Sequence, residues 1–144
     1  MPAETIAIAA DHAGFALKSV LAGELERLGY GVLDLGTHSA DSVDYPDFAQ
    51  AVAKAIEAGT SRRGVLICGS GIGVCIAANR FRAVRAALCH DMASAALARR
   101  HNDANVLALG ARLIGEDVAK DCLRAFLETE FEGGRHARRV AKMS

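Results

Sequence analysis

A thiol and a glycine-rich turn lie together in the segment 64–74. An apolar run from Val65 to Cys68 predicts a buried strand that ends at the thiol, and a helix is expected to begin near Ile72. The turn between them lets the backbone bend sharply and expose its N–H groups, because it contains Gly69, Gly71 and Gly73. The helix start adds unpaired N–H groups, so a thiolate or a developing oxyanion would be stabilised there. The segment therefore predicts a site where Cys68 acts as a base or a nucleophile, with Ser70 beside it.

The alternative for Cys68 is an ordinary buried cysteine that packs as a small hydrophobic residue. Its position directly before the glycine turn favours the chemical role. The remaining three cysteines fall inside apolar patterns and are assigned to the core: Cys75, Cys89 and Cys122. No pair has C-x-x-C spacing, which argues against a structural zinc site, and the long apolar chain argues against a disulfide framework. We therefore expect no structural zinc site, and we also expect no cofactor.

Polar residues also follow other predicted strands. Asp11 and His12 come after the apolar run 5–10, where Asp11 could cap a helix or contact a ligand, and His12 could donate to a phosphate. Tyr45 stands between Asp44 and Pro46, and could pack in the core or line a ligand site. Because these positions lie in or near strand-to-helix turns, the fold could bring them to Cys68.

Two further groups lie later in the chain. The segment 101–105 is predicted to be a polar turn at the sheet edge opposite Cys68, so His101 would either be solvated or serve the site of another subunit. Arg135 and Arg139 are four residues apart in a basic tail that follows a Gly-Gly pair. On a helix they share a side, which suits either an exposed basic face or a grip on a phosphate.

Strands and helices alternate along the chain with short connections. Apolar runs predict strands over 5–10, 32–35, 65–68, 84–88 and 106–109; helical spacing predicts helices over 15–28, 46–58, 72–79, 92–100 and 116–127, and a basic tail helix. This alternation is typical of an α/β fold: a doubly wound, five-stranded parallel sheet with helices on both faces. We expect one domain over 1–144, with a helical tail from about 128. Ligands of such sheets bind at the carboxyl edge.

Composition excludes several classes of function. Lysine plus arginine equals aspartate plus glutamate, 17 each, and this zero net charge argues against nucleic-acid binding. No apolar stretch is long enough to cross a bilayer, and no signal peptide is recognisable, so we expect a cytoplasmic protein without membrane contact.

Six motifs together make the chain similar to a known family. They are Asp11-His12-Ala13-Gly14, Asp44-Tyr45-Pro46, Cys68-Gly69-Ser70-Gly71-Ile72-Gly73, Ala77-Ala78-Asn79, His101-Asn102-Asp103-Ala104-Asn105 and Glu132-Gly133-Gly134-Arg135-His136. In this order they run from the first strand to the tail, and the chain thereby resembles ribose-5-phosphate isomerase type B. The wider family includes galactose-6-phosphate isomerase subunits and allose-6-phosphate isomerases.

The resemblance implies a Rossmann-like, metal-free aldose–ketose isomerase of the pentose phosphate pathway, which interconverts D-ribose 5-phosphate and D-ribulose 5-phosphate. It implies a homodimer with shared active sites and leaves open whether dimers pair into tetramers. Cys68 would be the general base; a branch of the family uses a glutamate where this chain has Val74. The other implied catalytic residues are Ser70 at the substrate oxygens, His101 for ring opening and Asp11 at the sugar hydroxyls.

The resemblance also implies a set of substrate contacts. The amides of residues 69–74 would hold the enediolate, and Tyr45 and Asn102 would lie against the sugar. Phosphate would be bound by His12, Arg112, Arg135 and Arg139. Two alternatives stay open: the same chemistry on a six-carbon sugar, allose 6-phosphate or galactose 6-phosphate, or a non-catalytic phosphate-binding module of flavodoxin-like architecture.

Overall fold

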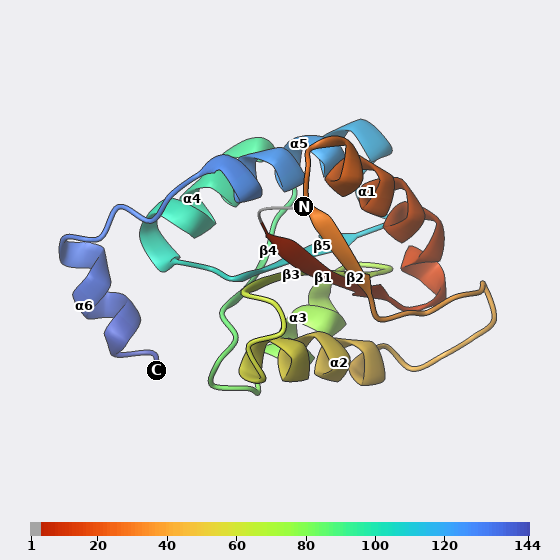
Figure 1. The fold of residues 1–144 in the computed structure, drawn as a ribbon, viewed down its shortest axis with the longest axis horizontal. Coiled ribbons are helices and arrows are strands. Elements are labelled where there is room, and N and C mark those ends of the chain that lie inside the picture. Colours follow the sequence, from red (N-terminus) through yellow and green to blue (C-terminus); the bar gives the residue numbers. More distant parts are fainter. Residues whose placement is uncertain (1–3) are drawn as a thin grey trace.

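The computed structural model of the chain describes residues 4–144, which form a parallel sheet between two layers of helices (Figure 1). The strands are β1 Thr5–Ala10, β2 Gly31–Asp34, β3 Arg63–Cys68, β4 Ala86–Leu88 and β5 Val106–Gly110. The helices are α1 Phe15–Arg27, α2 Tyr45–Glu57, α3 Ile72–Ala78, α4 Met92–Asn102, α5 Glu116–Glu128 and α6 Arg135–Ala141, and a 3₁₀ turn, η1, covers His12–Gly14. The predicted α/β class and the alternation of elements are confirmed.

The strand order is β2-β1-β3-β5-β4, and every pair is parallel. The chain proceeds from β1 outward to β2, then returns past β1 to β3 and continues to the other edge. The order therefore reverses between β1 and β3, which is where ligands of open α/β sheets bind. Asp11 follows β1 and Cys68 ends β3, so the topology puts both at this point.

Alternation along the strands builds one core on each face of the sheet. Ile6 and Ile8 face α1, α4 and α5, whereas Ala7 and Ala9 face α2 and α3, because successive side chains of a strand point to opposite sides (Figure 1). Cys68 belongs to the second face. The two-sided burial explains why β1, β3 and β5 are continuous apolar runs.

One ion pair links the buried Lys18 of α1 to the exposed Asp34 at the end of the edge strand β2. The Lys18 side chain is 2% exposed, and its ammonium donates to both Asp34 oxygens at 2.6 and 2.5 Å. Asp34 also accepts from the Gly36 N–H at 3.0 Å. Partial burial acts to raise the pKa of the Asp34 carboxyl, but the Lys18 ammonium and the Gly36 amide outweigh it and hold that pKa below its usual value.

Two predicted boundaries are wrong. The expected turn 101–105 begins later, because α4 continues through His101 and Asn102 and ends where Asp103 takes a left-handed conformation, φ 47°. The strand expected over 84–88 starts at Ala86, because the Arg85 N–H donates to the Asn105 side chain at 2.7 Å. Smaller shifts extend β3 back to Arg63 and start β2 at Gly31.

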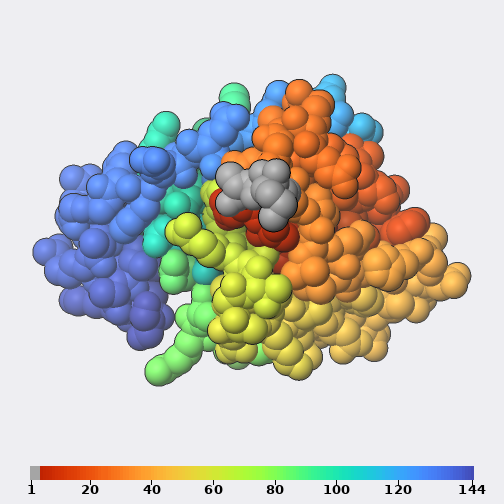
Figure 2. Space-filling model, viewed as in Figure 1, coloured from red at the N-terminus to blue at the C-terminus, as the bar shows by residue number. Residues whose placement is uncertain are grey.

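The tail leaves the body of the protein after α5. Residues 129–134 lead to α6, which stands at one end of the molecule (Figure 1), and both Gly133 and Gly134 have positive φ. Figure 2 shows a hollow between this tail and the segment near residues 79–85; its lining includes Asn79, Arg85 and Met143. Within residues 4–144, no helix combines the length and apolarity needed to cross a membrane.

Candidate active site

A pocket of about 550 Å³ opens at the carboxyl edge of the sheet. Its size lies within the usual range for small-molecule sites. Loops after β1, β3 and β5 contribute to it together with the first turns of α2 and α3. The lining residues are Asp11, Tyr45, Cys68, Gly69, Ser70, Ile72, Gly73, Ile76, Arg112 and Leu113. Seven of these residues were candidate site residues in the sequence. The fold brings them together because they lie at strand ends, in the loops that follow, or at helix starts on the same edge of the sheet.

Cys68 lies at the bottom of this pocket. Its residue exposure is only 5%, yet it belongs to the lining, and the Gly71 N–H donates to its Sγ at 3.2 Å. Gly71 has φ +79°, and a Cβ there would lie 2.5 Å from Leu88 and 2.8 Å from the Leu109 backbone. The turn that holds the sulfur therefore requires glycine at 71.

The floor of the pocket is joined to the hydrogen-bond ladder of the sheet. The Ala111 and Arg112 N–H groups donate to the carbonyls of Cys68 and Gly69, both at 2.9 Å. This pairing continues the β3–β5 ladder into the loops and brings Arg112 over Gly69. Ser70 Oγ accepts from the Ile72 N–H at 3.2 Å, which fixes the hydroxyl at the start of α3.

Asp11 both caps a turn and lines the pocket. Its Oδ1 caps η1 by accepting from the N–H groups of Ala13 and Gly14 at 3.0 and 3.2 Å, and the residue still lines the pocket. The predicted cap is therefore confirmed, although it caps the short 3₁₀ turn before α1. His12 lies outside the lining: its Nδ1 accepts from the Val43 N–H at 3.2 Å. That bond puts the proton of the neutral ring on Nε2, which is left as a donor.

Tyr45 packs directly against the glycine turn. It is the first residue of α2, and a Cβ built on Gly73 would lie 2.4 Å from its ring. Only a glycine lets α3 approach the tyrosine this closely. Tyr45 is thus a wall of the pocket, and its residue exposure of 41% leaves one side of the ring open.

Four expected site residues lie elsewhere in the same chain: His101, Asn102, Arg135 and Arg139. The first two form the last turn of α4 and the other two lie on α6. The sheet and its connecting loops separate these elements from the lining of the carboxyl-edge pocket.

A cluster around His101 was missed in the sequence. The His101 and His136 rings stack, with centroids 4.3 Å apart and planes 13° from parallel, and Glu132 Oε1 lies 3.8 and 3.6 Å from their Nε2 atoms. Burial lowers the pKa of His136, and the nearby His101, Arg135 and Arg139 add to this effect against the opposing Glu132 carboxylate. The i,i+4 spacing of Glu132 and His136 could have indicated the pair, but not its contact with α4.

This cluster is the one group of three potential metal ligands within residues 4–144. A metal ion bound to an imidazole nitrogen lies in the plane of the ring. Two nearly parallel, stacked rings share no such point, so the observed orientation of His101 and His136 does not converge on one ion.

The other cysteines differ from Cys68 in their surroundings. Burial raises the pKa of Cys89 to about 11 and that of Cys122 to about 12, and both thiols are enclosed in the core. Burial also raises the pKa of Cys75, which is half-buried on α3. The sequence assigned Cys75 to the core, whereas the structure puts it at the margin of the core on the second face of the sheet. All four cysteines are free thiols.

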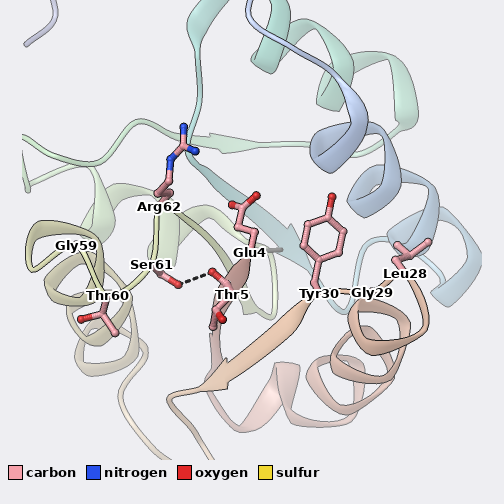
Figure 3. A pocket seen from close by; sticks show the side chains of 9 residues that line it. All are labelled: Glu4, Thr5, Leu28, Gly29, Tyr30, Gly59, Thr60, Ser61 and Arg62. Carbon is pink, nitrogen blue, oxygen red and sulfur yellow. Dashed lines mark hydrogen bonds between the residues drawn. The ribbon is translucent and has the colours of Figure 1, made fainter. Parts of the chain in front are cut away.

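A second hollow, of about 510 Å³, lies at the amino edge of the sheet (Figure 3). Its lining residues are Glu4, Thr5, Leu28, Gly29, Tyr30, Gly59, Thr60, Ser61 and Arg62. The Ser61 hydroxyl donates to the Thr5 carbonyl at 2.8 Å, and the Glu4 carboxylate is held by Arg63 at 2.6 and 2.8 Å. Because the Ser61 hydroxyl and the Glu4 carboxylate are already paired within the protein, we place the active site in the carboxyl-edge pocket and not in this hollow.

Comparison with known proteins gives a consistent result. Residues 6–143 match the family model described as Ribose/Galactose Isomerase. The chain is 47% identical over 135 residues to ribose-5-phosphate isomerase B of Escherichia coli, covering 94% of this chain and 91% of that one. It superposes on the Clostridium thermocellum ribose-5-phosphate isomerase B with a TM-score of 0.95 at 50% identity, covering 96% and 94%. The Mycoplasma genitalium enzyme, solved with bound ribulose-5-phosphate, gives 0.95 at 42% identity, covering 99% and 95%.

Proposed function

The chain belongs to the ribose/galactose isomerase family, and we infer from this membership and from the pocket that it is an aldose–ketose isomerase. It interconverts D-ribose 5-phosphate and D-ribulose 5-phosphate. The observation that carries this conclusion is the Cys68 thiol, which lines a pocket at the β1/β3 switch point and accepts an N–H from the glycine turn. A non-catalytic phosphate-binding module would have no use for that arrangement.

The reaction moves one carbon-bound proton and one hydroxyl proton. In the proposed mechanism the Cys68 thiolate takes the proton from C2 of the open-chain aldose, and the electron pair moves toward the carbonyl to leave an enediolate with its charge on O1. The O2 proton then passes to O1, and the thiol returns its proton to C1 to give the ketose. A positioned general base of this kind contributes on the order of 10²–10⁴ in rate.

The enediolate needs hydrogen-bond donors, because a proton beside a carbonyl is otherwise too weakly acidic for a thiolate. The Gly71 N–H donates to the Cys68 sulfur and the Ile72 N–H to the Ser70 hydroxyl, so we assign the enediolate to the remaining N–H groups of the 69–74 turn and to the Ser70 O–H. Each such donor is worth about 10²–10³ in rate in comparable sites. Base and donors thus come from one segment of chain.

Ring opening precedes proton transfer, since the aldose is mainly a furanose. We assign this step to His101 and the sugar hydroxyls to Asp11, whose Oδ1 holds the η1 cap and whose carboxylate also reaches the pocket. His12 presents an Nε2–H donor for the phosphate, and Arg112 supplies a cation in the pocket lining. The remaining phosphate contacts are assigned to Arg135 and Arg139, and a sugar contact to Asn102.

A homodimer with shared sites accounts for the residues that lie away from the pocket. His101 and Asn102 end α4, and the two arginines lie on α6, so a second copy must supply them to the Cys68 pocket. Exposed apolar side chains at the rim, Ile72, Ile76 and Leu113, support burial against a partner. The molar mass in solution, measured by sedimentation or light scattering, tests whether dimers pair into tetramers.

The dimer predicts complementation between two inactive variants. Mixed Cys68→Ala and His101→Ala proteins should regain part of the activity, because one hybrid site contains both missing groups. Subunit exchange is verified by tagging one variant. Exchange without any recovered activity would refute a shared site.

The isomerase assignment is tested by steady-state conversion of D-ribose 5-phosphate. Cys68→Ala should lower kcat by about 10²-fold or more while the far-UV spectrum and phosphate affinity stay unchanged. Cys75→Ala is the matched control, because that thiol lies on α3 outside the pocket lining and has no assigned role. Wild-type turnover in Cys68→Ala would remove the cysteine from the mechanism.

The sugar preference is tested with a panel of five- and six-carbon aldose phosphates that includes D-allose 6-phosphate and D-galactose 6-phosphate. The highest kcat/KM is expected for D-ribose 5-phosphate. A higher value for a six-carbon sugar would assign the enzyme to the other branch of the family. We also propose a cytoplasmic location, which is supported by the four free thiols and is tested by cell fractionation.

A further inference from the structure

The stack between His101 and His136 joins two parts of the chain that are otherwise separate. His101 lies in the last turn of α4, and His136 lies in the first turn of α6, beyond the Gly133–Gly134 hinge. The His136 side chain is 11% exposed, whereas that of His101 is 40% exposed. The more enclosed ring therefore presents a fixed surface against which the more exposed ring lies.

Glu132 connects the same two elements through its backbone and its side chain. Its N–H donates to the Arg100 carbonyl at 3.1 Å, which fastens the tail to the last turn of α4. Its Oε1 lies near both imidazoles, 3.8 Å from His101 Nε2 and 3.6 Å from His136 Nε2. One carboxylate oxygen thus faces both rings.

The charged groups around the stack come from α4, α6 and the segment between them. The groups that act on His136 are His101, Glu132, Arg135 and Arg139, and burial with the cationic neighbours lowers the pKa of its imidazole below the usual value. The Glu132 carboxylate also faces the more exposed His101 ring. A protonated imidazole can give a proton to the ring oxygen of a furanose as the C1–O4 bond breaks and the C1 hydroxyl loses its proton to water.

We propose that His136 and Glu132 are positioning residues that hold the His101 imidazole, and the proton it carries, in the orientation needed for opening the sugar ring. This inference rests on the proposed function for the role of His101, but the positioning itself is a property of the folded chain. Misplacing a catalytic group by about 1 Å can cost on the order of 10²-fold in rate.

The test compares His136→Ala, which removes the stack, with His136→Phe, which keeps an aromatic face but no titratable group. The exposed His90→Ala is the control for loss of a histidine. In ¹H–¹³C NMR spectra, the His101 ring protons should lose their ring-current shift in His136→Ala and keep it in His136→Phe. With D-ribose 5-phosphate, kcat/KM should fall about 10- to 100-fold in His136→Ala. In His136→Phe, kcat/KM should stay within about 3-fold of the wild-type value.

Glu132→Gln separates the carboxylate from the backbone contact of the same residue. In this variant kcat/KM for D-ribose 5-phosphate should fall about 10-fold while the free energy of unfolding stays at the wild-type value, because the N–H that fastens the tail to α4 is kept and the charge facing both rings is lost. Wild-type kcat/KM in His136→Ala, equal losses in His136→Ala and His136→Phe, or wild-type kcat/KM in Glu132→Gln would overturn the proposal. A wild-type protein that does not isomerise D-ribose 5-phosphate would refute the proposed function instead, whereas the ring-current shift would still report whether the stack holds His101.

Discussion

Replacing Gly73 by alanine should have opposite effects on stability depending on whether Tyr45 is present. A Cβ at position 73 would lie 2.4, 2.6 and 2.9 Å from ring atoms of Tyr45. Carbon atoms pack at about 3.5–4.0 Å, so the ring must move by about 1 Å. Because the contact is with a partly exposed side chain and not with backbone, the ring can move, but it leaves its packed position.

The magnitude follows from two opposing contributions. An extra methyl group forced into a packed contact costs about 1–3 kcal/mol. Alanine in place of glycine within α3 recovers about 0.5–1 kcal/mol of backbone entropy. The net expectation for Gly73→Ala is a loss of about 1 kcal/mol. In a Tyr45→Ala background the clash is absent, so the same substitution should stabilise the protein by about 0.5 kcal/mol.

Urea unfolding of the four proteins, at one fixed protein concentration, measures this double-mutant cycle. The coupling free energy should be about 1.5 kcal/mol. Gly73→Ala should also lower kcat/KM for D-ribose 5-phosphate by about 10-fold, because the displaced ring is a wall of the pocket. Equal changes in unfolding free energy in the two backgrounds would show that the glycine is not required by the tyrosine, and the reasoning would fail.

Further predictions concern the Lys18–Asp34 ion pair and the thiols. Asp34→Asn should destabilise the protein by about 1–2 kcal/mol at pH 7 in urea unfolding, because the buried Lys18 ammonium loses its counter-charge while solvent screens the 36% exposed Asp34; a loss below about 0.5 kcal/mol would contradict this. Since the pKa of Asp34 is lowered on folding, its stabilisation is complete above about pH 4 and is lost as the pH falls through the folded-state value. The difference between wild type and Asp34→Asn should therefore shrink between about pH 4 and pH 2, and a constant difference would argue against the pair. With iodoacetamide at pH 8, Cys68 should be labelled first and be protected by substrate, whereas Cys89 and Cys122, with pKa values of about 11 and 12, should stay unlabelled in the native protein; peptide mass spectrometry that finds Cys89 labelled first would refute this order.

The sequence predicted the sheet and most of the pocket for the same reason. Uninterrupted apolar runs identify strands that are buried on both faces, and parallel strands present all their carboxyl ends at one edge. Asp11 and Cys68 follow or end such strands, and the structure shows that β1 and β3 are neighbours, which brings the two residues together. Arg112 joins them because it follows β5 by two residues, and Tyr45 joins them as the first residue of α2.

The parts that the sequence did not predict depend on contacts between distant segments. Lys18 lies on the apolar side of α1, and its burial depends on Asp34 of β2, which local spacing does not reveal. The end of α4 was placed too early because Asn102 and Asp103 are typical turn residues. The helix continues because Arg99 donates to Asp103 at 2.9 Å and to the Ala104 carbonyl at 2.6 Å.

The join between the pocket floor and the sheet ladder limits how this enzyme can adapt. Cys68 and the 110–112 loop cannot shift without breaking the backbone pairs that continue β3 and β5, so the Ala111 and Arg112 amides should be among the slowest to exchange with deuterium. The walls, made by side chains such as Tyr45, Ile76 and Leu113, carry no such restraint. A protein engineer who wishes to change the length of the accepted sugar should therefore vary the walls and leave the floor untouched.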